Sequence, residues 1–596
     1  MADSQKSESL LIVDIGSTTT KIGLVDNVAG EYRFIASGAA ATTITPPDAD
    51  VLAGVRDAIR QIEARTQRRL LTVEGQLIAP ERAGAQGVDA LVAITSAPQP
   101  LRVAIVGLSR EISLASAINA INGTHAVVVA TLALDAIGGR WLPVRLPQEA
   151  QLDPKVVMTI LQDPAVIAAE TLARANPEVI VLVGGVDGGA TTALYDIANL
   201  VASIVASSDE NARPIIVFAG NSAARAQLAN HLGTLTQLRP VDNVRPTLEA
   251  ENLAPLRHEL EALYTERKIT WLPGLNTLAS WTNVPITSAS RAFQNVIRFL
   301  ARRWNLNVIG ADLGSAATTL VTARGEQSTR LVRADLGIGY GLERLLEQTG
   351  IERVLEWLPL EMNPDEAYAR CLNHALHPHA LPMTRDEVYL MHATARLALA
   401  TAAQGVSMDG FDTVVITGSV GAYNSNYGAL ALLILDALQP HGIFSLTVDP
   451  LGLAPALGGL AAENPAAAAS VLERDGLLTL GTVIAPTSRN RDGQIDLRIK
   501  VQPSGSGVIN LEVVHGSLEL VPLTTGQKAT IEVRPAAGVD LPQVKRGVFK
   551  ADIEGGALGL IIDARGRPLN LPTDPVKRRM QVQRWYWDIG GEVANG

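Results

Sequence analysis

The first hundred residues alternate between apolar strands, a polar turn and one amphipathic helix. Residues 10–16 (LLIVDIG) and 20–26 (TKIGLVD) are apolar runs that predict a hairpin, and residues 32–38 (YRFIASG) predict a third strand. In residues 49–66 the apolar positions Val51, Val55, Ile59 and Ile62 share one helical face. Short apolar strands follow at 89–97 and 102–109.

Residues 115–250 repeat a strand–helix pattern. Uniformly apolar strands separated by amphipathic helices predict βα units and a mostly parallel sheet that is buried on both faces. The expected strands are 125–131, 177–185, 213–220 and 234–241, and the expected helices are 165–176, 190–206 and 221–232. A charged helical stretch at 250–268 ends this part of the chain.

The second half begins with a copy of the opening pattern. Residues 305–323 (NLNVIGADLGSAATTLVTA) again read as strand, polar turn and strand, and Ala- and Leu-rich helices follow. Apolar strands are expected at 412–418 and 444–450. Residues 495–569 change to period-2 segments with Gly and Pro between them, which predicts a separate antiparallel β domain. The aromatic segment 581–591 (QVQRWYWDIGG) is expected to be its last strand.

Composition and charge narrow the class of protein. A chain of 596 residues, 47% hydrophobic and 18% charged, fits several α/β domains. The net charge of −10 and the lack of a Lys/Arg block argue against nucleic-acid binding. A single cysteine, Cys371, excludes an internal disulfide. The apolar run 428–435 is far shorter than the roughly 20 residues of a membrane span, and the N-terminus is short and polar, so we expect a soluble, cytoplasmic protein without membrane contact.

The candidate chemistry lies in the two polar turns. Each has an aspartate at the end of a buried strand, a glycine two residues later and then hydroxyl or small residues, from Asp14 in the first turn and from Asp312 in the second. One such turn is more often ordinary turn chemistry. Two of them, each opening an α/β half, predict backbone N–H groups and hydroxyls presented to a polyphosphate, with the aspartates holding waters of a Mg²⁺ ion.

These motifs resemble those of the actin, Hsp70 and sugar-kinase ATPase superfamily. Residues 14–21 match its first phosphate motif and residues 312–318 its second, while 333–346 resemble the Gly-rich turn that follows, and 414–423 the adenosine motif. The resemblance implies a two-lobed actin-like (ribonuclease H-like) α/β fold that binds ATP and Mg²⁺ between its lobes. It assigns nucleotide contacts to Gly16, Ser17, Thr18, Thr19, Lys21, Gly314, Ser315, Thr318, Asp335, Gly337, Gly339, Gly418, Ser419 and Gly421.

The implied roles differ between these residues. Asp14 and Asp312 would be the catalytic and metal-positioning residues, with Asp312 orienting the attacking water. Ser17, Thr18, Ser315 and Thr318 would hold phosphates, Lys21 would add a point charge, and the residues from Gly418 to Gly421 would line the adenosine side.

Four segments resemble one branch of this superfamily, the glutamate mutase accessory proteins of the GlmL/MutL family. They are residues 94–117, 176–194, 214–224 and 241–249, and the resemblance extends over about 10–480. It implies a chaperone-like protein that reactivates an adenosylcobalamin-dependent carbon-skeleton mutase and has that enzyme's subunits as partners. Where relatives often read Asp-x-Gly-Gly-x-Thr-Thr-Asp, this chain has Ser315, Ala317 and Thr319. The missing second carboxylate implies weak ATP hydrolysis.

The expected domains follow from these patterns. Residues 1–9 are a disordered tail, 10–114 the first ATPase lobe, 115–300 a Rossmann-like insertion with connecting helices, 301–487 the second lobe and 488–596 the β-rich domain. The superfamily leaves two alternatives open: a small-molecule kinase and a nucleotide-dependent assembly protein. The related activators of radical dehydratases need cluster-binding cysteines, which one Cys nearly excludes.

Two further patterns have weaker functional interpretations. Residues 181–194 (VLVGGVDGGATTAL) place Asp187 at the carboxyl edge of a parallel sheet, where open α/β sheets bind ligands, although a tight glycine turn explains the same pattern. Cys371, His374 and His377 are spaced along one segment, but ligands so local rarely surround a metal. We therefore expect a solvated helix end there.

Overall fold

The computed structural model describes residues 8–84, 86–134, 141–143, 164–422, 426–544 and 547–591. The chain divides into two compact units. Unit 1 comprises Met1–Ala97, Leu272–Arg330 and Asp335–Gly596, and unit 2 comprises Pro98–Trp271 and Leu331–Ala334. Most of the expected tail, residues 1–7, lies outside the described residues, but Ser9 is buried and already begins the first strand, so the tail prediction was wrong there.

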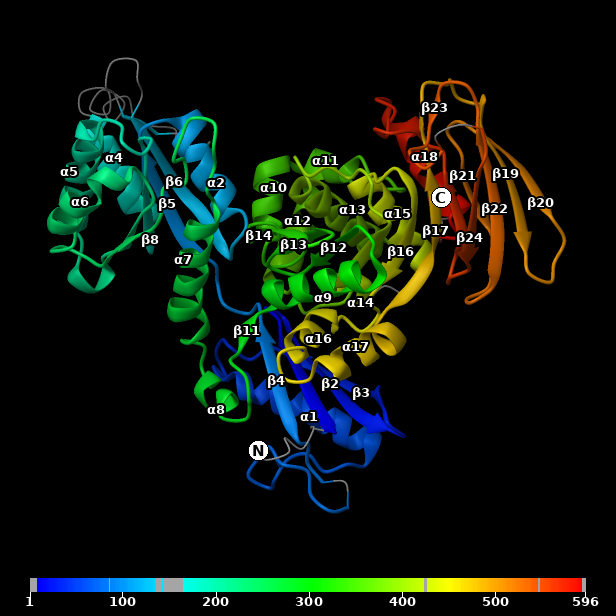
Figure 1. The fold of residues 1–596 in the computed structure, drawn as a ribbon, viewed down its shortest axis with the longest axis horizontal. Helices are drawn as coiled ribbons and strands as arrows, with labels where there is room; N and C mark the ends of the chain where they lie inside the picture. The colour runs from blue at the N-terminus through cyan, green and yellow to red at the C-terminus, as the bar shows by residue number, and fades with distance from the viewer. Residues whose placement is uncertain are drawn as a thin grey trace. The chain divides into compact units, whose positions relative to one another are not determined.

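The first lobe of unit 1 is built on a five-stranded sheet in the order β11-β4-β1-β2-β3 (Figure 1). Its strands are β1 (Ser9–Ile15), β2 (Thr19–Val28), β3 (Glu31–Ala41), β4 (Ala90–Thr95) and β11 (Thr287–Ser288). β1 pairs antiparallel with β2 and parallel with β4. Helix α1 (Val51–Thr66) contacts β3 and β2, and it buries Val55, Ile59 and Ile62, as its periodicity predicted.

The second lobe repeats this sheet and extends it. Eight strands run in the order β14-β13-β12-β15-β16-β17-β25-β21. They are β12 (Val308–Leu313), β13 (Thr318–Arg324), β14 (Gln327–Arg333), β15 (Thr413–Gly418), β16 (Gly442–Val448), β17 (Leu478–Ala485), β21 (Leu518–Val521) and β25 (Gly559–Asp563). β12 pairs antiparallel with β13 and parallel with β15, as β1 does with β2 and β4. This duplication confirms the predicted two-lobed α/β architecture.

Two helices lie between the sheets of the lobes (Figure 1). Helices α9 (Ala289–Trp304) and α16 (Ala454–Leu460) pack closely, and α16 also contacts β1 and β4. One hydrophobic core contains Ile12 of β1, Phe293 of α9, Leu457 of α16 and Val415 of β15. Burial of this shared core holds β1 and β12 at one interior, which brings their carboxyl ends together.

The remaining helices of the second lobe cover its sheet. They are α10 (Leu342–Thr349), α11 (Ile351–Leu355), α12 (Pro364–Leu376), α13 (Arg385–Ala402), α14 (Ser419–Ala422), α15 (Tyr427–Leu438) and α17 (Pro465–Val471). Helix α13 begins with a capping box, in which the Thr384 side chain accepts from the Glu387 N–H and the Glu387 carboxylate accepts from the Thr384 N–H. Such a box satisfies backbone donors that the first turn of a helix leaves unpaired.

The C-terminal strands are less separate than the sequence pattern suggested. A four-stranded antiparallel sheet, β20-β19-β22-β24, does form, from β19 (Ile495–Pro503), β20 (Ile509–Val514), β22 (Lys528–Pro535) and β24 (Phe549–Glu554). However, β21 and β25 join the second-lobe sheet beside β17, and one core connects Ile484 of β17 with Ile531 of β22. Period-2 alternation identified the strands but could not assign them to a sheet. A further two-stranded sheet is formed by β18 (Thr487–Ser488) and β23 (Val539–Asp540).

The expected final strand is instead a helix, α18 (Pro575–Asp588), so that prediction was wrong. The Asp574 side chain accepts from the Lys577 N–H, and Pro575 occupies the first turn. Val582, Trp585, Tyr586 and Ile589 are buried at spacings of three and four residues, which is the helical period. Trp587 points elsewhere and is 73% exposed.

Unit 2 is a six-stranded sheet in the order β10-β9-β8-β5-β6-β7. Its strands are β5 (Leu101–Gly107), β6 (Ala126–Leu134), β7 (Trp141–Pro143), β8 (Val179–Val183), β9 (Ile215–Phe218) and β10 (Leu238–Pro240). All pairs are parallel except β6–β7. Its helices include α2 (Ala115–Ile121), α4 (Pro164–Ala175), α5 (Thr192–Ser207), α6 (Arg225–Leu232) and α7 (Ala254–Tyr264). The structure places β5 here, so the boundary predicted at residue 114 falls inside this unit.

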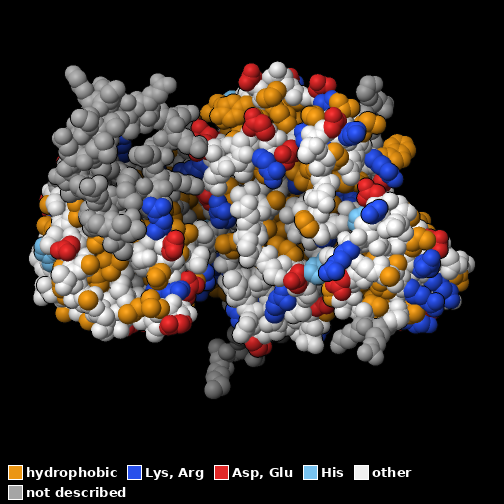
Figure 2. Space-filling model, turned by 90° about the horizontal axis from the view of Figure 1, so that it is seen from above, with side chains coloured by type: hydrophobic (Ala, Val, Ile, Leu, Met, Phe, Trp, Pro, Cys, Tyr) orange, Lys and Arg blue, Asp and Glu red, His pale blue; other side chains and the backbone are white. Residues whose placement is uncertain are grey.

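The surface in Figure 2 carries acidic and basic side chains side by side, with hydrophobic ones between them. Such mixed charge is typical of a solvated surface. Within the described part of the chain, no helix combines the length and hydropathy needed to cross a bilayer.

Candidate functional site

The two Asp-Gly turns have the same backbone construction. In the first, the Gly16 N–H donates to the Thr19 carbonyl at 3.1 Å, and in the second the Gly314 N–H donates to the Ala317 carbonyl at 3.0 Å. A Cβ at Gly16 would lie 2.7 Å from the Thr19 oxygen, closer than a side chain tolerates. Glycine is therefore required by the tightness of the turn between the two strands.

The first turn is held by hydrogen bonds from Thr42 to its carbonyl oxygens, so that the N–H and hydroxyl donors of the turn are not used. Thr42 donates from its N–H to the Thr18 carbonyl and from its hydroxyl to the Gly16 carbonyl, both at 2.8 Å. Within the described residues, the N–H groups and hydroxyls of Ser17 and Thr18 have no hydrogen-bond partner. Thr19 lies half-buried beside them. The turn thus presents a group of unpaired donors at the end of β1.

The second turn is covered by the Gly-rich segment 335–341. The Gly339 and Gly341 N–H groups donate to the Ser315 carbonyl at 2.9 and 3.0 Å, and the Ile338 N–H donates to Gly314. A Cβ at Gly337 or Gly339 would collide with Ser315. These glycines therefore serve close backbone packing on the second turn.

Thr318 has a different role from the predicted one. Its side chain is fully buried, and its hydroxyl donates to the Leu336 carbonyl at 2.9 Å, so it anchors the covering segment and cannot hold a phosphate. Asp335 accepts from the Gln348 amide at 2.8 Å. Ser315 keeps a hydroxyl that accepts from the Tyr340 N–H at 3.2 Å and still has a proton to donate.

The aspartates of the two turns belong to one electrostatic site. Burial raises the pKa of Asp14 to about 6, against the attraction of Lys21 and with a further increase from Asp449. Burial also raises the pKa of Asp312 to about 7, and the negative charge of Asp14 adds to this increase. Because carboxylates perturb each other only at short range in this way, the fold brings residues from opposite halves of the sequence together.

Asp14 has an unsatisfied atom. The carboxylate is buried, and its Oδ1 has no hydrogen-bond partner among the described residues. Across the hairpin, Asp14 is paired with Lys21, whose Nζ donates to the Gly452 carbonyl of the second lobe at 3.2 Å. A buried carboxylate oxygen without a donor is costly and indicates a missing cationic or hydrogen-bonding partner.

Asp449 is the member of the site that sequence reasoning missed. It follows β16, is fully buried, and accepts from the Thr417 hydroxyl at 2.7 Å and from the Ala454 N–H at 2.6 Å. It thereby fixes the start of α16 and adds negative charge near Asp14 and Asp312. The signal was present, because Asp449 lies near the end of the expected strand 444–450, just as Asp14 and Asp312 lie near the ends of theirs.

The predicted adenosine segment lies beside the second aspartate. Gly418 ends β15 with φ +90°, and a Cβ there would lie 2.7 Å from Asp312 Oδ1. Gly421 lies in α14, where a Cβ would come within 3.2 Å of Val448, and Ser419 begins that helix. The glycine at 418 thus lets β15 approach Asp312, whatever else the segment binds.

The donor set fits a hydrated Mg²⁺ and does not form a closed metal cage. In the described residues, no group of three or more His, Cys, Asp or Glu side chains is arranged to hold an ion. Mg²⁺ is commonly held by one or two carboxylates, with water and phosphate oxygens completing its shell. Two carboxylates of raised pKa, one with an unpartnered buried oxygen, match that requirement.

Asp187 lies in unit 2 and has its own partners. Its Oδ1 accepts from the Ser222 N–H at 2.9 Å and from the Asn243 amide at 3.1 Å. Burial opposes its ionisation, but these hydrogen bonds outweigh burial and lower its pKa. The carboxylate connects the ends of β8, β9 and β10.

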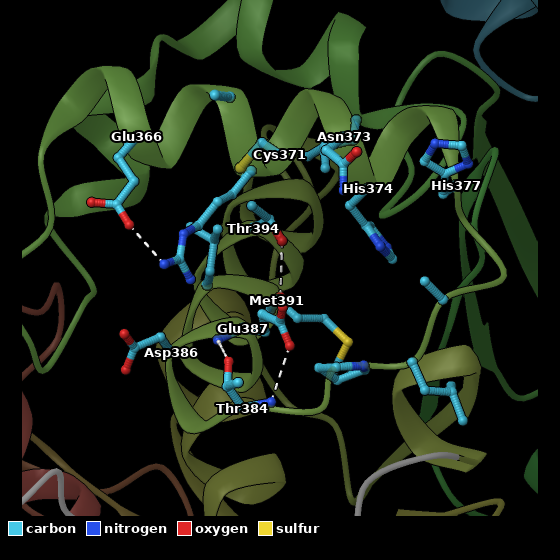
Figure 3. Close-up of a pocket in the computed structure, with 17 residues that line it drawn as sticks. Glu366, Cys371, Asn373, His374, His377, Thr384, Asp386, Glu387, Met391 and Thr394 are labelled. Carbon is cyan, nitrogen blue, oxygen red and sulfur yellow. Dashed lines mark hydrogen bonds and ion pairs between the residues drawn. The ribbon is translucent and has the colours of Figure 1, made fainter.

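The segment with Cys371, His374 and His377 lines a cavity of about 570 Å³ between α12 and α13 (Figure 3). This cavity is separate in its lining from the two Asp-Gly turns. Burial raises the pKa of the Cys371 thiol to about 12, so the thiol stays protonated. His374 and His377 lie at the end of α12, as predicted, but Cys371 is 1% exposed, so the expectation of a solvated segment was wrong for the thiol.

Comparison with known proteins identifies the family to which this sequence is similar. A family model described as "MutL protein" matches residues 10–476. "Protein MutL" of Clostridium tetanomorphum is 24% identical over 412 residues, which cover 66% of this chain and 77% of that protein. The match to the family ends just before β17, so the C-terminal strands lie outside it.

Distant likenesses to solved structures accompany this match. A glycerol dehydratase reactivase is 12% identical with a TM-score of 0.26, over 77% of this chain and 100% of that chain. A nucleotide-free acetone carboxylase chain is 12% identical with a TM-score of 0.33, over 86% of this chain and 81% of that chain.

Proposed function

The chain belongs to the MutL protein family, and we propose that it is an ATP-dependent accessory protein of an adenosylcobalamin-dependent enzyme, specifically a carbon-skeleton mutase of the glutamate mutase type. The observation that carries the nucleotide part of the proposal is the pair of matched turns whose aspartates share one electrostatic site. Membership of the family supports the accessory role, because the resemblance to its members implies that role.

The first turn would hold phosphate. The N–H groups of Ser17 and Thr18 and their hydroxyls have no protein partner within the described chain, and a phosphate oxygen accepts from such donors without a side chain intervening. Ser315 would contribute from the second turn with its remaining hydroxyl proton. Lys21 lies between the lobes and would place its charge near the same oxygens.

Asp14 and Asp312 would hold Mg²⁺ through its water shell. The bound ion would supply neutralisation of negative charge on the phosphate oxygens. The protein's own contribution would be to keep the two carboxylates buried and in fixed orientations. Asp449 fixes the start of the adjoining helix α16, and the absence of a side chain at Gly418 leaves room for the Asp312 carboxylate. Asp312, the less buried of the pair, would orient a water for in-line attack.

Slow turnover is the expected kinetic behaviour. The second turn carries Ser315, Ala317 and Thr319, and its Thr318 hydroxyl is engaged by Leu336. Few groups remain on that side to stabilise the charge that develops during phosphoryl transfer. Nucleotide binding and its conformational effect would then matter more than the rate of hydrolysis.

Calorimetric titration of MgATP tests the nucleotide site. We expect Asp14→Ala to weaken binding by at least tenfold, corresponding to about 1.4 kcal/mol or more. The control is Asp57→Ala, which removes an aspartate 59% exposed on α1. Equal affinity of wild type and Asp14→Ala would remove Asp14 from the site.

A second experiment tests the accessory role. The protein and MgATP are incubated with an adenosylcobalamin-dependent mutase that has been inactivated by a cobalamin lacking the adenosyl group. We expect restored mutase activity after free adenosylcobalamin is added, and much less restoration with Asp14→Ala. Phosphorylation of a metabolite would favour the kinase alternative, and ATP-dependent light scattering without a mutase would favour assembly.

A further inference from the structure

The cavity between α12 and α13 combines apolar walls with an excess of negative charge. Leu342, Leu390 and Met391 contribute apolar surface, and Met391 faces His374 across the opening (Figure 3). The ionised side chains around it are three carboxylates, Glu366, Asp386 and Glu387, and one guanidinium, Arg370. At about 570 Å³ the cavity lies in the size range of ligand-binding pockets.

Its charges are held in fixed positions. Glu366 forms an ion pair with Arg370 at 2.7 Å, which neutralises both. Glu387 accepts from the Met383 and Thr384 N–H groups at 2.8 and 3.0 Å, and these bonds lower the pKa of its carboxyl. Arg370 also attracts Glu387, but three carboxylates face one guanidinium, so the lining keeps an excess of two negative charges. The cavity favours a cationic occupant.

Apolar side chains continue from the cavity onto the surface. Leu381 lines the cavity and is 56% exposed, while Leu376 and Met383, each next in sequence to a lining residue, are 75% and 88% exposed. A small molecule inside the cavity would leave this rim in water. A protein segment would cover both the cavity and the rim, which is the usual reason for grouped exposed apolar side chains.

The wall of the cavity also touches the segment that covers the second Asp-Gly turn. The His374 ring is hydrogen-bonded to the Ile338 backbone, and burial lowers the pKa of this ring. A Cβ at Gly339 would lie 2.8 Å from Pro378, which shows how closely the helix end packs there. Ile338 in turn donates to Gly314 at 3.1 Å. Two consecutive hydrogen bonds, from His374 to Ile338 and from Ile338 to Gly314, thus join the cavity to the second Asp-Gly turn.

We propose that the α12–α13 cavity and its rim are a docking site for a segment of another protein that presents an apolar anchor beside lysine or arginine side chains. The anchor enters between Leu342 and Met391, and the basic side chains face Asp386 and Glu387. The docked segment alters the 335–341 turn, so that docking and nucleotide binding influence each other. This coupling rests on the proposed nucleotide site, whereas the docking itself does not.

Fluorescence anisotropy of a labelled amphipathic helical peptide of leucine and lysine tests the docking. The full-length protein should bind this peptide at micromolar concentration and at least tenfold more tightly than a matched leucine and glutamate peptide. Leu381→Ser should weaken binding by about five- to tenfold, the range of an exposed anchor contact. The control Leu248→Ser makes the same change at a side chain 58% exposed in unit 2 and should leave binding unchanged.

Equal binding of the two peptides would overturn the proposal. So would equal effects of Leu381→Ser and Leu248→Ser, because the peptide would then bind elsewhere. Asp386→Asn distinguishes loss of charge from loss of folding. It should weaken binding of the lysine peptide, while the melting temperature of the protein should stay within about a degree of wild type.

The coupling is tested by titrating MgATP with and without saturating lysine peptide. Coupling free energies of allosteric proteins correspond to 5- to 150-fold changes, so we expect at least a fivefold shift in MgATP affinity. His374→Leu should remove the shift while both ligands still bind. An unchanged MgATP affinity in wild type would overturn the coupling. Failure to bind MgATP at all would instead refute the nucleotide site and leave the peptide result standing.

Discussion

Asp14 shows how one residue can be costly to stability and useful to binding. Its carboxylate is buried, and Oδ1 has no partner in the described chain. Burying this oxygen without a partner destabilises the folded protein. A cation or hydrogen-bond donor that binds to the oxygen removes this cost, and the gain appears as binding affinity. Asp312 shares the site but is less buried, and Lys21 is the cation that lowers the pKa of both.

The first prediction concerns the stability of the nucleotide-free protein against pH. The folded pKa values of Asp14 and Asp312, about 6 and about 7, lie above the usual 3.8, so the native state binds more protons than the unfolded state between about pH 4 and 7. Stability from these groups is present at low pH and is lost as pH rises through this window. Urea unfolding at pH 5 and pH 8 should show it.

The Asp14→Asn variant measures how much Asp14 alone contributes to the pH dependence of the unfolding free energy. The fall in unfolding free energy between pH 5 and pH 8 should be smaller than in wild type by about 1–3 kcal/mol, because asparagine does not titrate. An identical fall in both proteins would contradict the raised pKa of Asp14.

A second prediction distinguishes two glycines of positive φ. Gly418 has φ +90° and no room for a Cβ beside Asp312, whereas Gly405 has φ +79° and open space around it. Gly405→Ala should destabilise by about 1 kcal/mol through backbone strain alone. Gly418→Ala should destabilise by at least about 2 kcal/mol more, because the added methyl must displace backbone. Equal effects in chemical unfolding would show that the close approach to Asp312 is unimportant.

At the scale of elements, a buried charge network fastens the C-terminal strands to the helices. Asp436 of α15 pairs with Arg396 of α13 at 2.9 Å and with Arg565, after β25, at 2.7 Å. Arg565 also pairs with Asp563, and its guanidinium lies 4.6 Å from the centre of the Trp585 ring of α18. Each charge is almost completely buried, so each depends on its partners.

The third prediction follows from that network. Asp436→Ala should destabilise unit 1 by about 3–5 kcal/mol, because two buried guanidinium groups lose their shared carboxylate. The comparison is Glu512→Ala, which removes the partner of Arg498 from a pair more than half exposed and should change stability by less than about 1 kcal/mol. Similar effects of the two substitutions on urea unfolding would mean that water reaches the network.

The elements also show where periodicity is informative and where it is not. The helix 51–66 was predicted from Val55 and Ile59, and it formed as expected. The segment 581–591 was read as a strand from its aromatic residues, although Asp574 and Pro575 begin a helix there. Trp585 packs against the Arg565 guanidinium and Tyr586 against the Tyr389 ring. Both partners are distant in sequence, so no local pattern could predict that these two rings are buried.

At the scale of the whole molecule, the two units have separate cores. Unit 1 contains the shared core of the two lobes and the C-terminal core, and unit 2 contains its own core around Ile180, Leu194 and Phe218. Separate cores permit separate unfolding transitions.

The fourth prediction uses this division. Scanning calorimetry should show two transitions, and MgATP at 100 times its dissociation constant should stabilise unit 1 by about 2.7 kcal/mol, which raises its transition by a few degrees. Asp187→Ala should lower only the other transition, since Asp187 joins three strand ends of unit 2. A single transition that both changes move together would show that the units unfold as one.

The two Asp-Gly turns, the repeated strand order that they open and the parallel sheet of unit 2 were all predictable from the sequence alone. Strand and turn preferences are local, so Gly16 and Gly314 are recognisable without a partner. The sequence motifs implied a shared site for Asp14 and Asp312, but the mutual effect of their charges, the place of Asp449 beside them and the bond of Thr318 to Leu336 are visible only in the folded structure. The tertiary structure also decided that β21 and β25 extend the second-lobe sheet. Each of these depends on contacts between residues far apart in the chain, which form when a common core is buried and which no local pattern encodes.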